Sequence, residues 1–91
     1  MKIYIAGKIT GDKNYKAKFT RVAHKFRTTD TIITPSVLPE RGMSKADYMR
    51  ICFAMIDSAD KVAFIQDWRD SPGATVEHGY CRYIGKPIIY L

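Results

Sequence analysis

The sequence predicts an α/β fold in which a parallel four-stranded sheet, in the strand order 2-1-3-4, carries helices on both faces. Strand-like and helix-like segments alternate along the whole chain, and the connections between strands are long enough for crossovers. The 91 residues, 46% of them hydrophobic, suit one small domain that covers residues 1–91. We therefore expect a small three-layer sandwich.

The first half of the chain supplies two strands and one helix. Lys2–Ala6 predicts a strand because it is rich in isoleucine and tyrosine, and a glycine ends it. Residues 14–28 predict a helix, since the apolar side chains return with helical spacing as Tyr15, Phe19, Val22, Ala23 and Phe26. Residues 31–34 form a short β-branched strand that Pro35 stops.

The second half repeats this alternation. Ser44 is a helix N-cap with Asp47 in the capping-box position, and the inner face of that helix consists of Tyr48, Ile51, Cys52, Met55 and Ala59. Residues 61–65, or 61–66, form the third strand, residues 74–84 the third helix and residues 87–91 the last strand. The arrangement is flavodoxin-like, so a ligand crevice is expected outside the carboxyl ends of strands 1 and 3.

The segment from Asp67 to Glu77 is the most informative part of the chain. It follows the third strand, and Ser71 then Pro72 make a favourable helix start. Gly73 allows a ligand to approach the backbone, and Glu77 falls in the second turn, where the helix dipole favours its ionised form. A carboxylate there can act as a nucleophile or bind a sugar hydroxyl. An ordinary capped helix start with an acidic residue is the alternative.

Two further features border the expected crevice. Gly7, Lys8 and Gly11 belong to a loop after the first strand whose backbone N–H groups can face a phosphate, although it is neither a Walker A motif nor a dinucleotide fingerprint. A plain strand-to-helix connection explains the same residues. Trp68 can stack on a base or a sugar, or can instead cover the end of the sheet or a subunit contact.

The histidines, cysteines and serines of the chain give no sign of a metal or cofactor site. The two histidines and two cysteines lack metal-ligand spacing, and no Ser-His-Asp pattern is present. We therefore predict no metal and no cofactor. The one enzymatic mechanism that the residues support uses the carboxylates of Asp67, Asp70 and Glu77. Such a mechanism suits displacement at the anomeric carbon of a sugar.

Charge and hydropathy limit the partners. The net charge of +6 favours an anionic ligand, but the basic residues are dispersed and no nucleic-acid motif appears, so binding to nucleic acid is not expected. Many of the basic residues in the first helix, among them Lys16 and Lys18, are assigned to its solvated face.

No apolar run approaches the ~20 residues of a membrane span, and no signal-peptide pattern follows Met1. We expect a cytoplasmic protein that forms a homodimer or higher oligomer, because so small a sheet exposes apolar surface.

An ordered set of short motifs runs through nearly the whole chain. It consists of Ile3-Tyr4-Ile5-Ala6-Gly7-Lys8-Ile9-Thr10-Gly11, Asp47-Tyr48-Met49, Ser58-Ala59-Asp60, Trp68, Ser71-x-Gly73-Ala74-x-x-Glu77 and Gly85-Lys86-Pro87. This set resembles the nucleoside 2-deoxyribosyltransferase superfamily, and within it most closely the compact DUF4406 branch.

The resemblance implies roles for individual residues. Glu77 matches the nucleophile that attacks C1′ of a nucleoside, and Tyr4 matches the tyrosine that orients it. Ser71 matches an aspartate of the deoxyribosyltransferases that holds the 5′-hydroxyl. In the related 2′-deoxynucleoside 5′-phosphate N-hydrolases, the same position is a serine that contacts the phosphate. The implied reaction is cleavage or transfer of the N-glycosidic bond of a 2′-deoxynucleoside 5′-monophosphate, so the implied partner is a small-molecule nucleotide or nucleoside.

Cys52 departs from the pattern of the superfamily. Active members carry at this position an aspartate that delivers a proton to the leaving base. The departure keeps a second interpretation open, that of a nucleotide-binding protein without turnover, which senses or sequesters its ligand.

Overall fold

The computed structural model describes residues 1–91 and has the predicted sheet. Strand β1 (Lys2–Ala6) lies between β2 (Thr31–Ile33) and β3 (Lys61–Phe64), and β4 (Ile88–Tyr90) pairs with β3. All three pairings are parallel, which gives the order β2-β1-β3-β4. The predicted strand order and the parallel direction are both confirmed.

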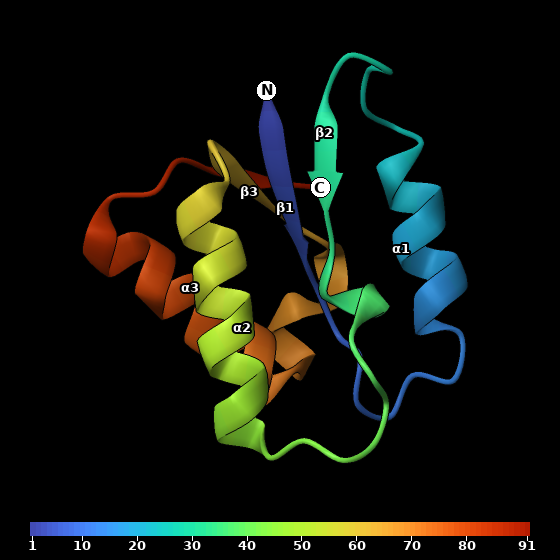
Figure 1. Cartoon of the computed structure of the whole chain (residues 1–91). Coiled ribbons are helices and arrows are strands. Elements are labelled where there is room, and N and C mark those ends of the chain that lie inside the picture. Colours follow the sequence, from blue (N-terminus) through green and yellow to red (C-terminus); the bar gives the residue numbers. More distant parts are fainter.

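Helices cover both faces of the sheet (Figure 1). Helix α1 (Tyr15–Ala23) packs on one face, and α2 (Lys45–Ser58) and α3 (Pro72–Ile84) pack together on the other. Because side chains alternate along a strand, Tyr4 of β1 points toward α2 and α3 whereas Ile5 points toward α1. The three predicted layers are therefore present.

Each face has its own buried core. The core under α2 and α3 consists of Tyr4, Ala6, Cys52, Ile56, Ala59, Val62, Phe64, Trp68, Ala74 and Cys81. The smaller core under α1 consists of Ile5, Tyr15, Phe19, Val22 and Ile65. No helix is both long enough and apolar enough to span a bilayer.

The first helix is shorter than the predicted 14–28. It ends at Ala23, and the N–H groups of Lys25 and Phe26 then bond to carbonyl oxygens three residues back, at 3.0 and 3.3 Å. Phe26 still packs against the core under α1. The apolar stripe therefore continues beyond the helix itself, which is why the spacing overestimates its length.

The bounds of several other elements also differ from the predicted ones. The strands β2, β3 and β4 are each shorter than predicted, although Ile65 and Leu91 still donate backbone hydrogen bonds across the sheet to Ala6 and Phe64, at 2.8 and 2.9 Å. Two 3₁₀ helices, η1 (Pro35–Val37) and η2 (Gln66–Asp70), occupy segments expected to be loops. Such single turns have too few residues to show a period.

The capping box of α2 forms as predicted. The Ser44 hydroxyl accepts a hydrogen bond from the Asp47 N–H at 3.0 Å, and Asp47 accepts one from the Ser44 N–H at 3.0 Å. This pair of bonds satisfies two free N–H groups and fixes where α2 begins. The first turns of α2 then face the carboxyl edge of the sheet, where the site lies.

Candidate active site

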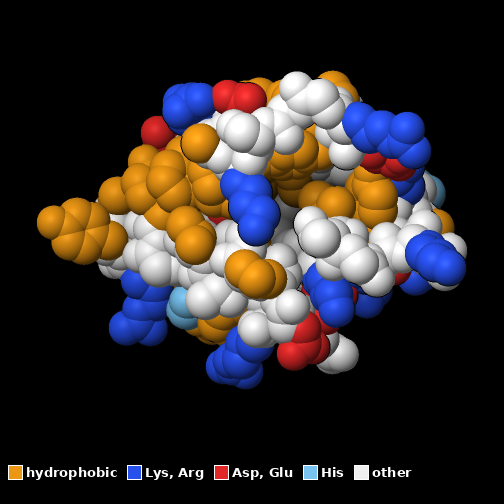
Figure 2. Space-filling view, turned by 90° about the horizontal axis from the view of Figure 1, so that it is seen from below, with side chains coloured by type: hydrophobic (Ala, Val, Ile, Leu, Met, Phe, Trp, Pro, Cys, Tyr) orange, Lys and Arg blue, Asp and Glu red, His pale blue; other side chains and the backbone are white.

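A cleft of about 780 Å³ opens at the carboxyl edge of the sheet. Its walls are the loop after β1, the loop between β2 and α2, the first turns of α2 and the start of α3. Figure 2 views this end of the molecule and shows the hollow, with lysine, arginine and apolar side chains around it. The volume falls within the range of small-molecule sites.

Tyr4 and Glu77 meet beside this cleft. The Tyr4 hydroxyl donates a hydrogen bond to Oε2 of Glu77, although 73 residues separate the two in the sequence. Tyr4 is fully buried, and Glu77 is only 4% exposed and lines the cleft. Strand β1 and helix α3 hold the two groups from opposite sides, so the carboxylate has a fixed direction.

Burial dominates the electrostatics of this pair. It raises the pKa of Glu77 to about 7, while the hydroxyl of Tyr4 and then the thiol of Cys52, both hydrogen-bond donors, act in the opposite direction. Burial, and next the charge of Glu77, raise the pKa of Tyr4 well above its ordinary value, so this hydroxyl keeps its proton. Glu77 is therefore a carboxyl group that ionises near neutral pH.

Cys52 of α2 also lines the cleft and is 3% exposed. Burial raises the pKa of its thiol to about 11. The side chain is therefore a neutral, poorly acidic group at neutral pH. It stands close enough to Tyr4 and Glu77 to affect the pKa values of both.

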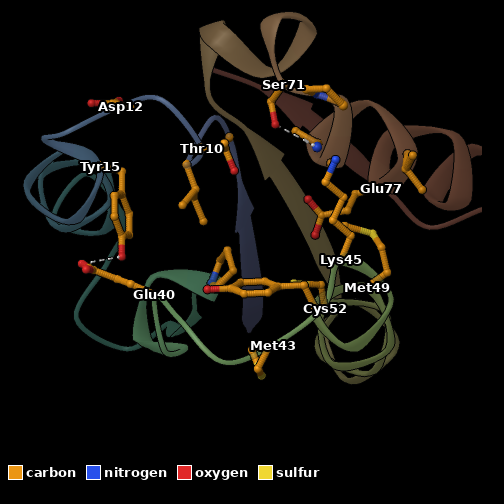
Figure 3. Close-up of a pocket in the computed structure, with 18 of the residues that line it drawn as sticks. Thr10, Asp12, Tyr15, Glu40, Met43, Lys45, Met49, Cys52, Ser71 and Glu77 are labelled. Atoms are coloured by element: carbon orange, nitrogen blue, oxygen red, sulfur yellow. Dashed lines mark hydrogen bonds between the residues drawn. The ribbon is translucent and has the colours of Figure 1, made fainter.

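The start of α3 forms another wall. The Ser71 hydroxyl caps the helix by accepting a hydrogen bond from the Ala74 N–H at 3.2 Å (Figure 3). Pro72 has no N–H, and the N–H of Gly73 has no acceptor within the chain. The cleft therefore contains a free backbone donor at the positive end of a helix.

The predicted site residues divide into two groups. Gly7, Ser71, Gly73 and Glu77 line the cleft, and Tyr4 reaches it only through its hydrogen bond to Glu77. Lys8, Gly11, Asp67 and Trp68 do not line it.

Gly7 is required by packing. A Cβ at this position would lie 2.9 Å from Cδ1 of Ile65 and 3.2 Å from Oδ1 of Asp67. The absence of a side chain therefore lets the loop after β1 lie directly against the end of β3. Gly11 has a positive φ of 84°, and it allows the same loop to turn.

Asp67 is engaged within the protein. Its Oδ1 accepts a hydrogen bond from the Lys8 N–H at 3.0 Å, and its Oδ2 lies 2.5 Å from Nζ of Lys18. Lys18 also contacts Asp12 Oδ2 at 2.6 Å and the Lys8 carbonyl oxygen at 2.7 Å. The assignment of Lys18 to a solvated face is wrong, because its side chain is only 15% exposed and ties the loop after β1 to η2.

Trp68 packs away from the cleft. Its indole stacks on the His78 ring with centroids 4.1 Å apart and meets the edge of Phe64 at 5.5 Å. The side chain is 7% exposed. It covers the end of the sheet, which is one of the alternatives that the sequence left open.

Sequence reasoning missed the rest of the cleft. Tyr15 donates a hydrogen bond to Glu40 at 3.2 Å (Figure 3). Outside the lining, Lys16 forms an ion pair with Glu40 at 3.2 Å. Lys13 and Lys45 line the cleft and form no ion pair. Glu40 comes from an irregular segment, and the lysines lie in a loop or at exposed helix starts, so none of these four carries a periodic signal; the helical spacing identified Tyr15 only as a packing residue.

No group of three or more histidine, cysteine, aspartate or glutamate side chains is positioned to hold a metal ion. The one acidic residue at the centre of the site, Glu77, has a tyrosine and a cysteine as its polar neighbours.

A family model described as "Domain of unknown function (DUF4406)" matches residues 1–90. The chain belongs to this DUF4406 family. The resemblance stated from the sequence motifs is thereby confirmed. No curated protein matches the chain in sequence.

Solved structures extend the comparison beyond this DUF4406 family. The chain is similar to a 2-deoxyribosyltransferase from the psychrotolerant bacterium Bacillus psychrosaccharolyticus, with a TM-score of 0.71, 22% identity, and coverage of 99% of this chain and 71% of the other. It is also similar to a conserved protein from Enterococcus faecalis V583, with a TM-score of 0.70, 17% identity, and coverage of 99% and 62%. The DUF4406 chain therefore has the fold of a 2-deoxyribosyltransferase.

Proposed function

We propose that this protein cleaves or transfers the N-glycosidic bond of a 2′-deoxynucleoside 5′-monophosphate, with Glu77 as the nucleophile. The observation that carries the proposal is the buried hydrogen bond from Tyr4 to Glu77 at the edge of a nucleotide-sized cleft. The hydroxyl occupies Oε2, which leaves the other carboxylate oxygen to attack. The fold shared with a 2-deoxyribosyltransferase supports the same reaction class.

The chemistry follows from the electrostatics. Attack by Glu77 on C1′ forms a glycosyl ester as the base departs, and water or a second base then releases the sugar. Because the pKa of Glu77 is about 7, a large fraction of the enzyme carries the required carboxylate at neutral pH. Tyr4 keeps its proton and therefore stays a hydrogen-bond donor throughout.

A 5′-phosphate suits the start of α3. Ser71 lies at its N-cap, and the N–H of Gly73 is free to donate. Lys13 and Lys45 add two positive charges to the cleft that no carboxylate of the chain neutralises. Helix N-termini and lysines together bind phosphates well. We therefore favour a nucleotide over a free nucleoside.

The test is base release from a panel of purified 2′-deoxynucleosides and their 5′-monophosphates, followed by chromatography. We expect free base from at least one monophosphate and loss of release in Glu77→Gln. Glu40→Gln is the matched control, because Glu40 also lines the cleft but pairs with Lys16 at the exposed rim. A panel that yields no base at all rejects the enzymatic proposal.

The second candidate is nucleotide binding without turnover. It is favoured by Cys52, which places a weakly acidic thiol where the resemblance implies a proton-donating aspartate. Calorimetry that shows tight binding of a nucleotide, together with no base release, would select this alternative. If no nucleotide stabilises the fold against heat, both candidates are rejected.

We also propose that the protein self-associates in the cytoplasm through α3. Val76, Tyr83 and Ile84 of this helix are 50, 92 and 43% exposed, so an apolar strip faces solvent beside the cleft. The two buried free thiols suit the reducing cytoplasm. Light scattering at micromolar concentration tests self-association. We expect the mass of a dimer or larger oligomer, and we expect Tyr83→Glu to shift that mass toward the monomer. A monomeric mass for the unchanged protein contradicts the proposal.

A further inference from the structure

The cleft contains three carboxyl groups, and only one of them is in a position to carry a proton at neutral pH. The three belong to Asp12, Glu40 and Glu77. An N-glycosidic bond to an ordinary base needs a proton donor, since a neutral heterocycle leaves poorly as an anion. Whether Asp12 or Glu40 can be that donor therefore decides which bases can leave.

Both of these groups are held as carboxylates by lysines. Asp12 lies 2.6 Å from Nζ of Lys18, and Glu40 lies 3.2 Å from Nζ of Lys16 and accepts a hydrogen bond from Tyr15. These contacts lower the pKa of each carboxyl group below its ordinary value. Figure 3 also shows both residues across the cleft from Glu77.

The two protonated groups beside Glu77 are poor acids. The Tyr4 hydroxyl already donates a hydrogen bond to the carboxylate and holds its proton tightly, and Cys52 is a thiol whose pKa burial raises to about 11. Proton transfer is efficient when the donor's pKa lies near the working pH. Glu77 itself cannot fill this role while it attacks C1′, because the nucleophile must be ionised.

We propose that the substrate is a nucleotide whose base carries a positive charge, such as a pyridinium or an N7-alkylated purine, so that the base leaves without receiving a proton. This inference rests on the proposed function and specifies its substrate class.

The walls of the cleft suit such a base. The aromatic residues Tyr15 and Tyr48 both line it, from α1 and α2 respectively. Aromatic faces attract flat cationic rings as well as stacking on them. The carboxylate of Glu77 adds a negative charge across the cleft from Tyr15 (Figure 3). A cationic heterocycle therefore finds favourable contacts on both walls.

The bonds and charges balance without an added acid. An oxygen of Glu77 forms a bond to C1′, the C1′–N bond breaks, and its electron pair neutralises the positive ring of the departing base. Water then forms a bond to C1′ and the ester C1′–O bond breaks. The products are the neutral base, the sugar phosphate with a hydroxyl at C1′, the Glu77 carboxylate and one proton released to solvent.

The test compares two substrates that differ in a single methyl group, 7-methyl-2′-deoxyguanosine 5′-monophosphate and 2′-deoxyguanosine 5′-monophosphate. We expect kcat/KM for the methylated nucleotide to exceed that of its neutral partner at least about 100-fold, the lower range of what an enzymatic acid contributes. Similar values for the two would overturn the inference and leave the proposed function intact. If the enzyme releases base from neither of these two nor from any other monophosphate of the panel, above the rate without enzyme, the proposed function fails as well.

The pH profile supplies a second readout. With a pyridinium 2′-deoxynucleotide, whose ring has no N–H proton to lose, kcat/KM should rise as Glu77 ionises and then remain level at alkaline pH, because no acid has to stay protonated. Because Cys52 donates a hydrogen bond to Glu77, Cys52→Ser should change the height of the profile but should still give no fall at alkaline pH. An alkaline fall that depends on Cys52 would show that the thiol protonates the base, and would overturn the inference.

Discussion

The Tyr4 hydroxyl of the first strand donates a hydrogen bond to the Glu77 carboxylate of the last helix, and both side chains are buried at the wall of the cleft. The tyrosine is fixed by strand register and the glutamate by the helix that Ser71 caps. Glu77 lines the cleft, so the strand and the helix together hold its carboxylate at the cleft wall. This preorganisation is what a nucleophile needs.

Removing the hydroxyl should weaken the nucleophile. In Tyr4→Phe the carboxylate loses a charge-assisted hydrogen bond, of a kind that contributes about 1.5–3 kcal/mol. Since that bond lowers the pKa of Glu77, we expect the acidic limb of the kcat/KM profile to move to higher pH and activity at pH 7 to fall about tenfold or more. Base-release rates between pH 5 and 9 measure this. An unchanged limb would mean that Tyr4 does not orient the carboxylate.

Folding stability should depend on the ionisation of Glu77. The folded protein keeps this proton up to about pH 7, whereas in the unfolded chain the pKa has its ordinary value of 4.5. Between these values the folded state binds more protons, so stability falls as pH rises, by on the order of 3 kcal/mol in total. Urea unfolding at pH 5 and pH 8 measures the difference.

The control for this effect is Glu77→Gln, which keeps the shape of the side chain but cannot ionise. We expect the fall in stability across that pH window to be much smaller in this variant. Equal pH dependence in the two proteins would show that Glu77 is not the group responsible.

Lys18 should stabilise the wall of the cleft more than its neighbour Lys16. Lys18→Met leaves Asp12 and Asp67 without their shared partner, so we expect a loss of about 1–3 kcal/mol and a raised KM. Lys16→Met breaks an exposed pair with Glu40 and should change the free energy of unfolding much less. Denaturant unfolding and KM measurements compare the two. Equal effects would contradict a structural role for the Lys18 contacts.

An acid placed at Cys52 should broaden the range of substrates. Cys52→Asp introduces a carboxyl group beside Glu77, where burial and a neighbouring charge both raise its pKa. We expect release of neutral bases to increase by about 100-fold, the low end for general acid catalysis, with little change for a positively charged base. Thermal unfolding with and without nucleotide controls for folding. If Cys52→Asp increased base release from neutral and positively charged substrates equally, the inference that the unchanged protein lacks an acid for neutral bases would be contradicted.

Much of the fold could be predicted from the sequence because its signals are local. The apolar runs, the capping box at Ser44 and Asp47 and the Ser-Pro start before α3 each depend on neighbouring residues. The strand order then followed from crossover geometry. Boundaries were less predictable, as at Phe26, where an apolar side chain reaches the core from outside its helix.

The cleft was harder to predict, because most of its contacts join distant parts of the chain. Asp67 follows β3 and looks like a site residue, yet it binds Lys18 from α1 and the Lys8 N–H. Glu40 lies in a loop with no periodic pattern, and only the folded chain brings it against Tyr15. The placement of Tyr4 beside Glu77 was anticipated from the motif resemblance rather than from local pattern.

The most direct measurement of the central claim is mass spectrometry of the protein quenched during incubation with a 7-methylated 2′-deoxynucleoside 5′-monophosphate. We expect a covalent deoxyribosyl 5-phosphate adduct on the peptide that contains Glu77, and no adduct in Glu77→Gln. Base release without an adduct on that peptide, or an adduct on another residue, would contradict the assignment of Glu77 as the nucleophile.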